Sequence, residues 1–376
     1  MDILEEIYQQ SNGSETGFLH KNVLFIGSES YDAPTITIIQ GLDDLGFEVY
    51  TIKKPNINSW FCNKVVDSTD GLKFDFVLSN LSWGTKWSYY EKYNLKPYLK
   101  VLIDGDDNQF YCKSWRKKYS YYEKSFVFNP PEDVKNLNIM PYRWVESLGS
   151  YEPDIVFVSQ KSFDDKESLY LPFGIHKQYY DFFINKSTAE RSTDFLHVPG
   201  PALYKDRMNL LLRICRKFKI IPGNIKISED RSREVVAEKI RENFLKDDNV
   251  HSYHRWAMSV PYFDDLNNAK VLIYPGIDPY PFWDSKRQWE AYASGCLVMM
   301  SKPNIDVSEY PITEICNYAV YGSYLEFIQK CRYLYNHQDF LDKLRRDSFE
   351  RSKKYFTPKP IANYFLKLIK ENIKIN

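Results

Sequence analysis

The chain has 376 residues, of which 43% are apolar and 27% charged, and this length allows two globular domains. Its 50 basic and 50 acidic residues give a formal net charge of zero, which argues against general binding to nucleic acid or to an anionic membrane. The N-terminal sequence MDILEEIYQQ is acidic, and no apolar run is long enough for a membrane span. Six scattered cysteines indicate reduced thiols, so we expect a soluble, cytoplasmic protein.

Strand and helix patterns alternate along the first half of the sequence. A short amphipathic helix within residues 1–20 precedes a strand at 22–27, a helix at 34–45 that ends at Gly46, and further strands at 47–52, 74–79, 101–104, 125–128 and 154–159. The first turn, Gly27-Ser28, lacks the GxGxxG pattern of dinucleotide sites. LPFGI at 171–175 ends this half, and residues 1–176 are predicted to form one α/β domain.

A polar stretch at 176–192 indicates a linker, and a second α/β domain is predicted over residues 177–357. Its strands are expected at 194–198, 225–227, 271–274 and 297–300, and its helices at 206–218, 233–246, 262–268, 285–294, 324–335 and 337–355. A last helix is predicted at 358–375. The fold class is therefore α/β with two Rossmann-like domains, whose sheets face one central cleft.

The segment AKVLIYPGIDPYPFWDSKRQWEAYASGCLVMM, at 269–300, is a strand–loop–helix–strand unit typical of a parallel sheet. Arg287 and Glu290 are three residues apart and share one face near the start of its helix. Ligands of such sheets bind where helices begin, and a cation at a helix N-terminus favours an anionic partner.

Cations at the ends of two strands suit a diphosphate, and a carboxylate one helical turn away suits the two hydroxyls of a ribose. Lys205 and Arg207 follow the first strand of the second domain, while Lys286 and Arg287 follow a later one. These residues predict a nucleotide-diphosphate site. The alternative is that Arg287 and Glu290 form an ordinary ion pair on a solvated helix, and their spacing does not decide between the two.

SKRQWEAYASGCLVMM resembles the donor-site segment of glycosyltransferases with the GT-B fold, in which an Arg-x-x-Glu-Ala helix leads into Ser/Ala-Gly-Cys and an apolar strand. It is similar to the group 1 enzymes, including their spore-maturation-protein branch, and to exostosin-like enzymes. LPFGI, DFLHVPGPALYKDRMNLL and LIDGDD resemble further segments of these families, in the same order. The resemblance implies a C-terminal helix, here 358–376, that crosses back to the N-terminal domain.

The resemblance also implies a function, namely transfer of a sugar from a UDP- or GDP-sugar to a glycan, protein or other hydroxyl acceptor by a hexosyltransferase. Glu290 would bind the donor ribose and Arg287 the diphosphate, with cations rather than a metal or other cofactor offsetting the charge of the leaving group. The N-terminal domain would bind the acceptor. The implied donor-binding residues are Gly200, Lys205, Arg207, Asp284, Ser285, Lys286, Arg287 and Glu290.

One position departs from the family pattern. Many retaining members carry a second Glu eight residues before the ribose Glu, and here that position is Phe282. Two alternatives stay open. One is a non-catalytic subunit that binds a nucleotide or a glycan. The other is a transferase that modifies a DNA base, for which Arg116-Lys117-Lys118 could supply contacts although the net charge speaks against it.

The acidic sequence Asp104-Gly105-Asp106-Asp107 follows a predicted strand. Its carboxylates could hold a divalent metal, form a solvated turn, or supply the base that deprotonates the acceptor. We expect no metal, and we take Asp106 or Asp107 as the candidate base. Packing rather than sugar stacking is expected for the aromatic residues near Tyr89 and Tyr90, and a buried structural role for His197.

Overall fold

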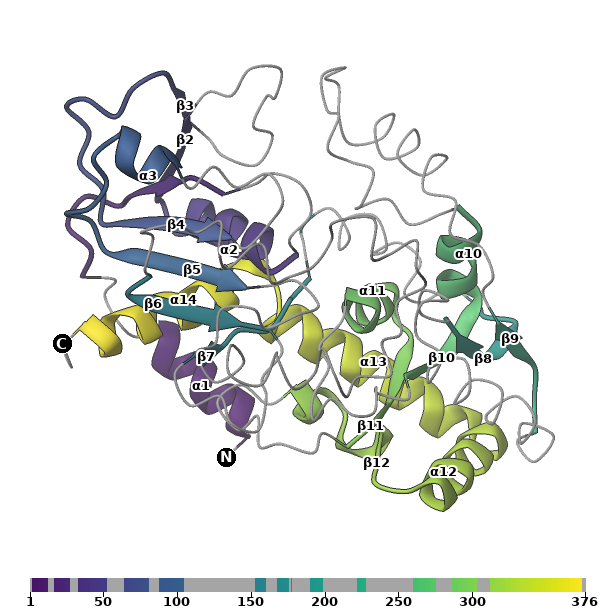
Figure 1. The fold of residues 1–376 in the computed structure, drawn as a ribbon. Helices are drawn as coiled ribbons and strands as arrows, with labels where there is room; N and C mark the ends of the chain where they lie inside the picture. The colour runs from purple at the N-terminus through teal and green to yellow at the C-terminus, as the bar shows by residue number, and fades with distance from the viewer. Residues whose placement is uncertain are drawn as a thin grey trace, which may run out of the picture.

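The computed structural model describes residues 2–12, 17–27, 33–52, 64–80, 88–104, 153–159, 168–175, 177, 190–198, 222–227, 260–274, 286–302 and 312–373. Within these ranges the chain forms two parallel sheets with helices packed around them (Figure 1). The predicted strand at 125–128 and the predicted helices at 206–218 and 233–246 lie outside the described residues, as does nearly all of the predicted linker.

The N-terminal sheet has seven strands among the described residues, in the order β3-β2-β1-β4-β5-β6-β7, and every pair of neighbours is parallel. The first six follow the strand order of a Rossmann sheet. In this order, successive strands are added on one side of β1 up to β3 and on the other side from β4 onward. These strands are β1 (Asn22–Phe25), β2 (Glu48–Ile52), β3 (Lys64–Val66), β4 (Phe76–Asn80), β5 (Lys100–Asp104), β6 (Ile155–Val158) and β7 (Leu169–Tyr170).

The C-terminal sheet has five described strands in the order β12-β11-β10-β8-β9, again all parallel. Numbered from β8, this is the order of a flavodoxin-like sheet. The side on which successive strands are added changes between β8 and β10. The strands are β8 (Thr193–His197), β9 (Ile225–Ile227), β10 (Ala269–Tyr274), β11 (Leu297–Ser301) and β12 (Val320–Tyr321).

The described helices agree with the predicted ones to within a few residues. They are α1 (Ile3–Asn12), α2 (Ala33–Asp44), α10 (Val260–Asn268), α11 (Lys286–Ser294), α12 (Tyr324–Asn336), α13 (Gln338–Tyr355) and α14 (Pro358–Ile373). The sequence analysis missed the short helix α3 (Ser88–Lys92) and the 3-10 turns η4 (Ile312–Ile315) and η5 (Asn317–Ala319). It also missed β3, β7 and β12, which are edge strands too short to show an apolar pattern.

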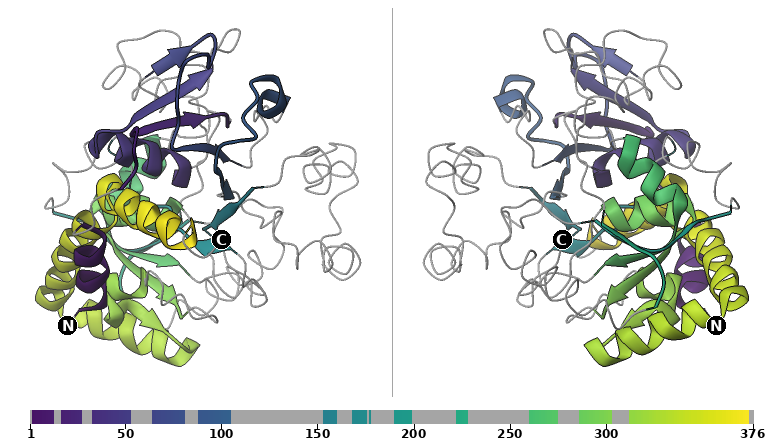
Figure 2. Two further views of the ribbon diagram at one scale, coloured as in Figure 1. Left: turned by 90° about the vertical axis from the view of Figure 1, so that its left-hand side faces the viewer. Right: turned by 90° about the vertical axis from the view of Figure 1, so that its right-hand side faces the viewer.

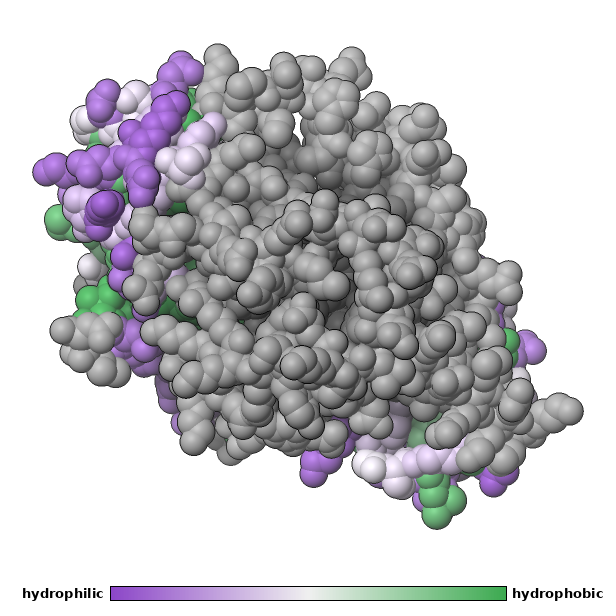
Figure 3. All heavy atoms as spheres, in the orientation of Figure 1, coloured by the Kyte–Doolittle hydropathy of each residue, from purple (hydrophilic) through white to green (hydrophobic). Residues whose placement is uncertain are grey.

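Burial explains which strands were easy to recognise. All five residues of β4 are buried, as expected for the centre of a parallel sheet covered on both faces. The edge strand β3 instead exposes Lys64, which pairs with Glu48 of β2 at 3.2 Å. Charged side chains on an edge strand oppose pairing with another chain. Figure 3 shows hydrophilic side chains over this part of the described surface.

The C-terminal helix α14 packs against the N-terminal sheet and α2. The ring of Phe365 lies 4.6 Å from Phe157 and 6.1 Å from Phe76, measured between ring centres. A Cβ on Gly41 of α2 would collide with the backbone of Pro358, so the two helices approach each other more closely than a side chain would allow. The helix therefore crosses back to the N-terminal half of the molecule.

The junction between α13 and α14 connects the two halves. The backbone N–H of Ile175 donates to the carbonyl oxygen of Phe356 at 2.8 Å. On the other side, the ring of Phe356 lies 4.7 Å from that of Trp289 in α11, and both residues are buried. One residue thus contacts the end of the first half and the central helix of the second.

The helix α1 lies against both α13 and α14 (Figure 2). Asp2 pairs with Arg351 and Glu5 with Lys354, both in α13, while Gln10 accepts from Lys367 of α14 at 2.9 Å. Its contacts span the junction at Phe356. In the part of the chain that the structure describes, no helix is long and apolar enough to cross a membrane.

Candidate functional site

The reversal of strand order between β8 and β10 defines the region where a ligand of the C-terminal sheet is expected. The two strands are parallel neighbours, with His197 paired to Ile273, and both end at the same edge of the sheet. The helix α11 follows β10 along the chain, and its C-terminal end leads directly into β11. Because β10 and β11 are parallel, α11 begins at the carboxyl edge of the sheet and ends at the opposite edge.

Two of the predicted donor-binding side chains lie on the first turns of α11. Arg287 is partly exposed, whereas Glu290 is only 1% exposed. A carboxylate with so little exposure does not belong to a solvated helix surface, so the interpretation as an ordinary surface ion pair is wrong for Glu290. Burying a carboxylate is costly unless polar partners surround it, which is typical of a functional position. The predicted residue Lys286 begins the helix.

The helix α11 ends at Ser294, the last residue of the helix predicted at 285–294, and a glycine follows it. Gly295 has a φ of 81°, the left-handed region that only glycine enters without strain. Its N–H donates to Tyr292 at 3.0 Å, and the N–H of Cys296 donates to Ala291 at 2.9 Å. These two bonds form a Schellman motif, which stops the helix and turns the chain into β11.

One face of α11 packs against the junction between α13 and α14. Trp289 is 1% exposed, and its ring plane is tilted by 38° to that of Phe356 at 4.7 Å between ring centres, so one face of the helix lies against the junction between the halves. In Figure 1 this helix is drawn between the strands of the two sheets. Its position is therefore determined by both halves of the molecule.

His197 and Tyr274 end the two strands at the reversal point and are 5% and 8% exposed. The Nδ1 atom of His197 lies 3.3 Å from the carbonyl oxygen of Ile273, so the ring nitrogen can donate to the backbone of the neighbouring strand. The expectation of a buried, structural His197 is confirmed. Tyr90 likewise is 4% exposed and belongs to an apolar cluster with Leu95, which confirms packing rather than sugar stacking at that residue.

Polar residues also lie at the carboxyl ends of the N-terminal strands. Ser79 and Asn80 end β4 and are fully buried, and a Cβ on Gly27 after β1 would collide with the side-chain oxygen of Asn80. This is the reversal point of the N-terminal sheet, where a ligand of that sheet is expected. The strand predicted at 74–79 stops one residue short of Asn80, whose only signal in the sequence is its place directly after an apolar run.

Seven of the ten predicted site residues lie outside the described part of the chain, namely Asp106, Asp107, Gly200, Lys205, Arg207, Asp284 and Ser285. Asp104 is described as the last residue of β5, where it pairs with Val158. Among the described residues, no group of three or more His, Cys, Asp or Glu side chains could hold a metal ion.

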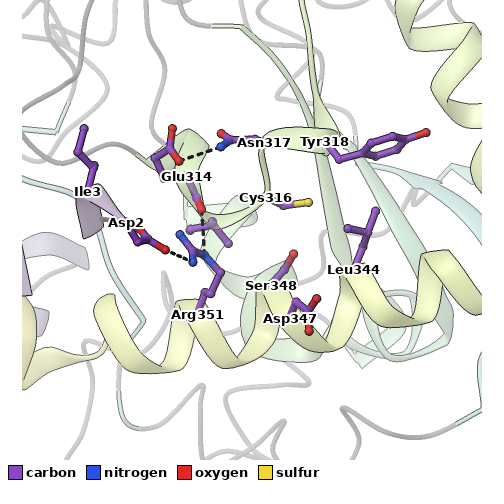
Figure 4. Close-up of a pocket in the computed structure, with 11 residues that line it drawn as sticks. Asp2, Ile3, Glu314, Cys316, Asn317, Tyr318, Leu344, Asp347, Ser348 and Arg351 are labelled. Carbon is purple, nitrogen blue, oxygen red and sulfur yellow. Dashed lines mark hydrogen bonds and ion pairs between the residues drawn. The ribbon is translucent and has the colours of Figure 1, made fainter. Parts of the chain in front are cut away.

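A pocket of 520 Å³ lies elsewhere, between the first turn of α1, the η4–η5 segment and α13 (Figure 4). Asp2 and Arg351, which form an ion pair, line one side of it, and Cys316 lines it from the η4–η5 segment. Burial raises the pKa of the Cys316 thiol, which disfavours the reactive thiolate. Neither Arg287 nor Glu290, the two predicted site residues whose side chains the structure describes, lines this pocket.

No protein-family model matches the sequence, and no curated protein is similar to it in sequence. The fold is similar to solved structures. A glycosyltransferase from Rickettsia africae ESF-5 has a TM-score of 0.50 at 12% identity, covering 94% of this chain and 99% of that chain. Sucrose-phosphate synthase from Thermosynechococcus elongatus has a TM-score of 0.48 at 11% identity, covering 94% and 100%. T4 phage BGT, solved with UDP and Mn2+, has 0.45 at 13% identity, covering 94% and 99%.

At such low identity the likeness concerns the fold alone, and we draw it from the Rickettsia structure. The fold is that of a GT-B glycosyltransferase, with two Rossmann-like domains. The predicted fold class is confirmed.

Proposed function

We propose that the protein is a glycosyltransferase that moves a sugar from a nucleotide-diphosphate sugar to an acceptor hydroxyl. The observation that carries this proposal is the nearly complete burial of Glu290, one turn after Arg287, on a helix that starts at the reversal point of the C-terminal sheet. The GT-B fold and the resemblance of residues 269–300 to donor-site segments support it. The spore-maturation-like and exostosin-like character of that segment remains part of the proposal.

The chemistry assigned to the donor site follows from its charges. A carboxylate accepts hydrogen bonds from two vicinal hydroxyls, so Glu290 would hold the ribose. Arg287 would contact the diphosphate and, with Lys205, Arg207 and Lys286, offset the negative charge that develops on the leaving group. Cations in these positions supply the stabilisation that a metal supplies elsewhere. UDP and GDP are the proposed nucleotides, and Gly200, Asp284 and Ser285 complete the proposed donor-binding set.

The acceptor is assigned to the N-terminal half. Asp106 or Asp107 would remove the proton from the acceptor hydroxyl, because both closely follow in sequence the strand β5, which ends at Asp104. We propose residues 1–176 as the acceptor domain, 177–357 as the donor domain and 358–376 as the crossing helix, with a glycan, a protein or another hydroxyl compound as acceptor. A cytoplasmic location completes the proposal.

Binding of UDP and GDP to wild type and to Glu290→Gln, measured by isothermal titration calorimetry, tests this function. Removing a charge-assisted hydrogen bond costs about 1.5–3 kcal/mol, so we expect the variant to bind at least about tenfold more weakly. The 2′,3′-dideoxy form of the preferred nucleotide should bind wild type and variant equally, because it lacks the hydroxyls assigned to Glu290.

Glu350→Gln is the matched control, since Glu350 is an exposed carboxylate on α13. It should leave nucleotide affinity unchanged. Equal affinity of wild type and Glu290→Gln for the intact nucleotide would refute the donor-site assignment. Nucleotide binding without slow hydrolysis of any nucleotide-sugar would instead support a non-catalytic binding subunit.

A further inference from the structure

Two buried arginines, far apart in the sequence, meet at the C-terminal end of α11. Arg191, just before β8, is 4% exposed, and Arg345 of α13 is 8% exposed. Arg191 Nη2 donates to the carbonyl oxygen of Ser294, and Arg345 Nε donates to that of Gly295 at 3.1 Å. Both guanidinium groups therefore hold the last carbonyls of the helix that carries Glu290.

The carbonyl oxygens of Ser294 and Gly295 accept no hydrogen bond from the Schellman motif. The Schellman motif uses the carbonyls of Ala291 and Tyr292, and the oxygens that follow need other donors. Positive charge is favourable there, because the C-terminal end of a helix carries the negative end of its dipole. The two arginines thus complete the cap with directional bonds.

Arg191 reaches beyond α11. Its Nη1 atom donates to the carbonyl oxygens of Leu266 at 2.8 Å and Ala269 at 2.6 Å, at the end of α10 and the start of β10. One planar group therefore joins three segments of the C-terminal half. A guanidinium can do this because its donors point in fixed directions, whereas the single ammonium of a lysine cannot span the same acceptors.

The arrangement has an electrostatic cost. Burial lowers the pKa of Arg345, and the positive charge of Arg191 lowers it further, while Asp342 at 2.8 Å opposes both effects. Bringing two cations together out of water is unfavourable, so stability alone gives little reason for choosing arginine at both positions. Fixed geometry is what two guanidinium groups provide and apolar packing does not.

We propose that Arg191 and Arg345 are positioning residues. They prevent α11 from shifting along its axis, and so hold the carboxylate of Glu290 at the position that nucleotide binding requires. This proposal rests on the donor site proposed above. Glu290 lies four residues before Ser294 on a helix of nine residues, so a shift at the clamped end moves the carboxylate by the same amount. Arg191 and Arg345 act through the position of Glu290 and do not contact the nucleotide themselves.

A double-mutant cycle with Arg191→Lys and Glu290→Gln tests the proposal by UDP titration, or GDP titration if that nucleotide is preferred. We expect Arg191→Lys to weaken binding about tenfold with Glu290 present and less than twofold with Gln at that position. A merely structural role would weaken binding equally in both backgrounds. Arg346→Lys, an exposed arginine beside Arg345, should change nothing.

Hydrogen exchange of the α11 amides gives a readout that does not depend on nucleotide, and we expect faster exchange in Arg191→Lys and Arg345→Lys. If Arg191→Lys does not fold, Arg345→Lys takes its place in the cycle, since it loses a single carbonyl contact. Unchanged affinity in a folded variant, beside weak binding by Glu290→Gln, overturns the positioning role alone. Absence of nucleotide binding by wild type overturns the donor site, and the positioning role with it.

Discussion

The β1–α2–β2 unit of the first half and the β10–α11–β11 unit of the second half follow the same plan but are held in different ways. Each helix ends in a Schellman motif around a glycine, Gly46 with a φ of 79° and Gly295 with a φ of 81°. In the first unit the N–H of Phe47 bonds to Leu42 at 3.0 Å, as that of Cys296 bonds to Ala291 in the second. The local structure of the two helix ends is therefore nearly identical.

The difference lies in what surrounds the helices. α2 is covered by the apolar face of α14, which approaches it closely at Gly41. α11 is instead tied at its end by Arg191 and Arg345. Apolar contact is non-directional and resists exposure more than sliding, whereas hydrogen bonds fix a position. α2 also has directional bonds, such as that from Thr37 Oγ1 to the carbonyl oxygen of Phe173 at 2.7 Å, but these lie along the helix. The comparison teaches that the helix assigned to ligand binding is the one whose C-terminal end is held by two buried guanidinium groups.

The largest expected effect concerns the apolar contact of the first half. Phe365→Ala should lower the free energy of unfolding by about 3–5 kcal/mol, because Phe365 is fully buried between Phe76 and Phe157 and its removal leaves a cavity. Urea denaturation measures this loss. Ile373→Ala, at a 46% exposed position of the same helix, should stay within about 0.5 kcal/mol of wild type. Equal losses in both variants would show that α14 is not held by its buried face.

A smaller effect sharpens the similarity of the two helix ends. Gly46→Ala and Gly295→Ala should each lower the free energy of unfolding by about 1–2 kcal/mol, because both glycines have positive φ values that strain a side chain. Thermal denaturation of the two variants provides the comparison. An increase in melting temperature for either variant would contradict the assigned cap.

The smallest effect is electrostatic and lies outside both units. Hydrogen bonds from Lys354 and Tyr355 lower the pKa of Glu5 from 4.5 to about 2. The folded state therefore binds a proton less readily than the unfolded state, so the contribution of Glu5 to stability is complete above pH 4.5 and is lost as the pH falls toward 2. Glu5→Gln should flatten the pH dependence of the melting temperature in that window, slightly, because the group is exposed. An unchanged pH profile would mean that the pairing of Glu5 with α13 does not contribute to the free energy of unfolding.

Much of the fold could be predicted because its signals are local. The apolar run Val271–Tyr274 and the stop at Gly295 identify a strand and a helix end without any knowledge of the rest. β3 and β12 could not be predicted in this way, because a short edge strand forms only when a neighbour offers its hydrogen bonds. Their existence depends on the sheet and not on their own sequence.

The site was predictable only where a pattern carried it. Arg287 and Glu290 stood out by their spacing on a short helix, but their spacing did not reveal that Glu290 is buried. Arg191 gave no signal, because charged residues are normally exposed and its partners are backbone carbonyls from three distant segments. Tertiary contacts of this kind have no trace in a single sequence.

The position of Phe356 couples the two halves of the molecule. Its carbonyl is bonded to Ile175 and its ring rests on Trp289, so the point where the chain passes between the halves is also a point where they touch. A rotation of one half relative to the other would therefore act on α11 through the contact between Phe356 and Trp289. Events in the half proposed to bind the acceptor would then reach the helix proposed to bind the donor through this residue.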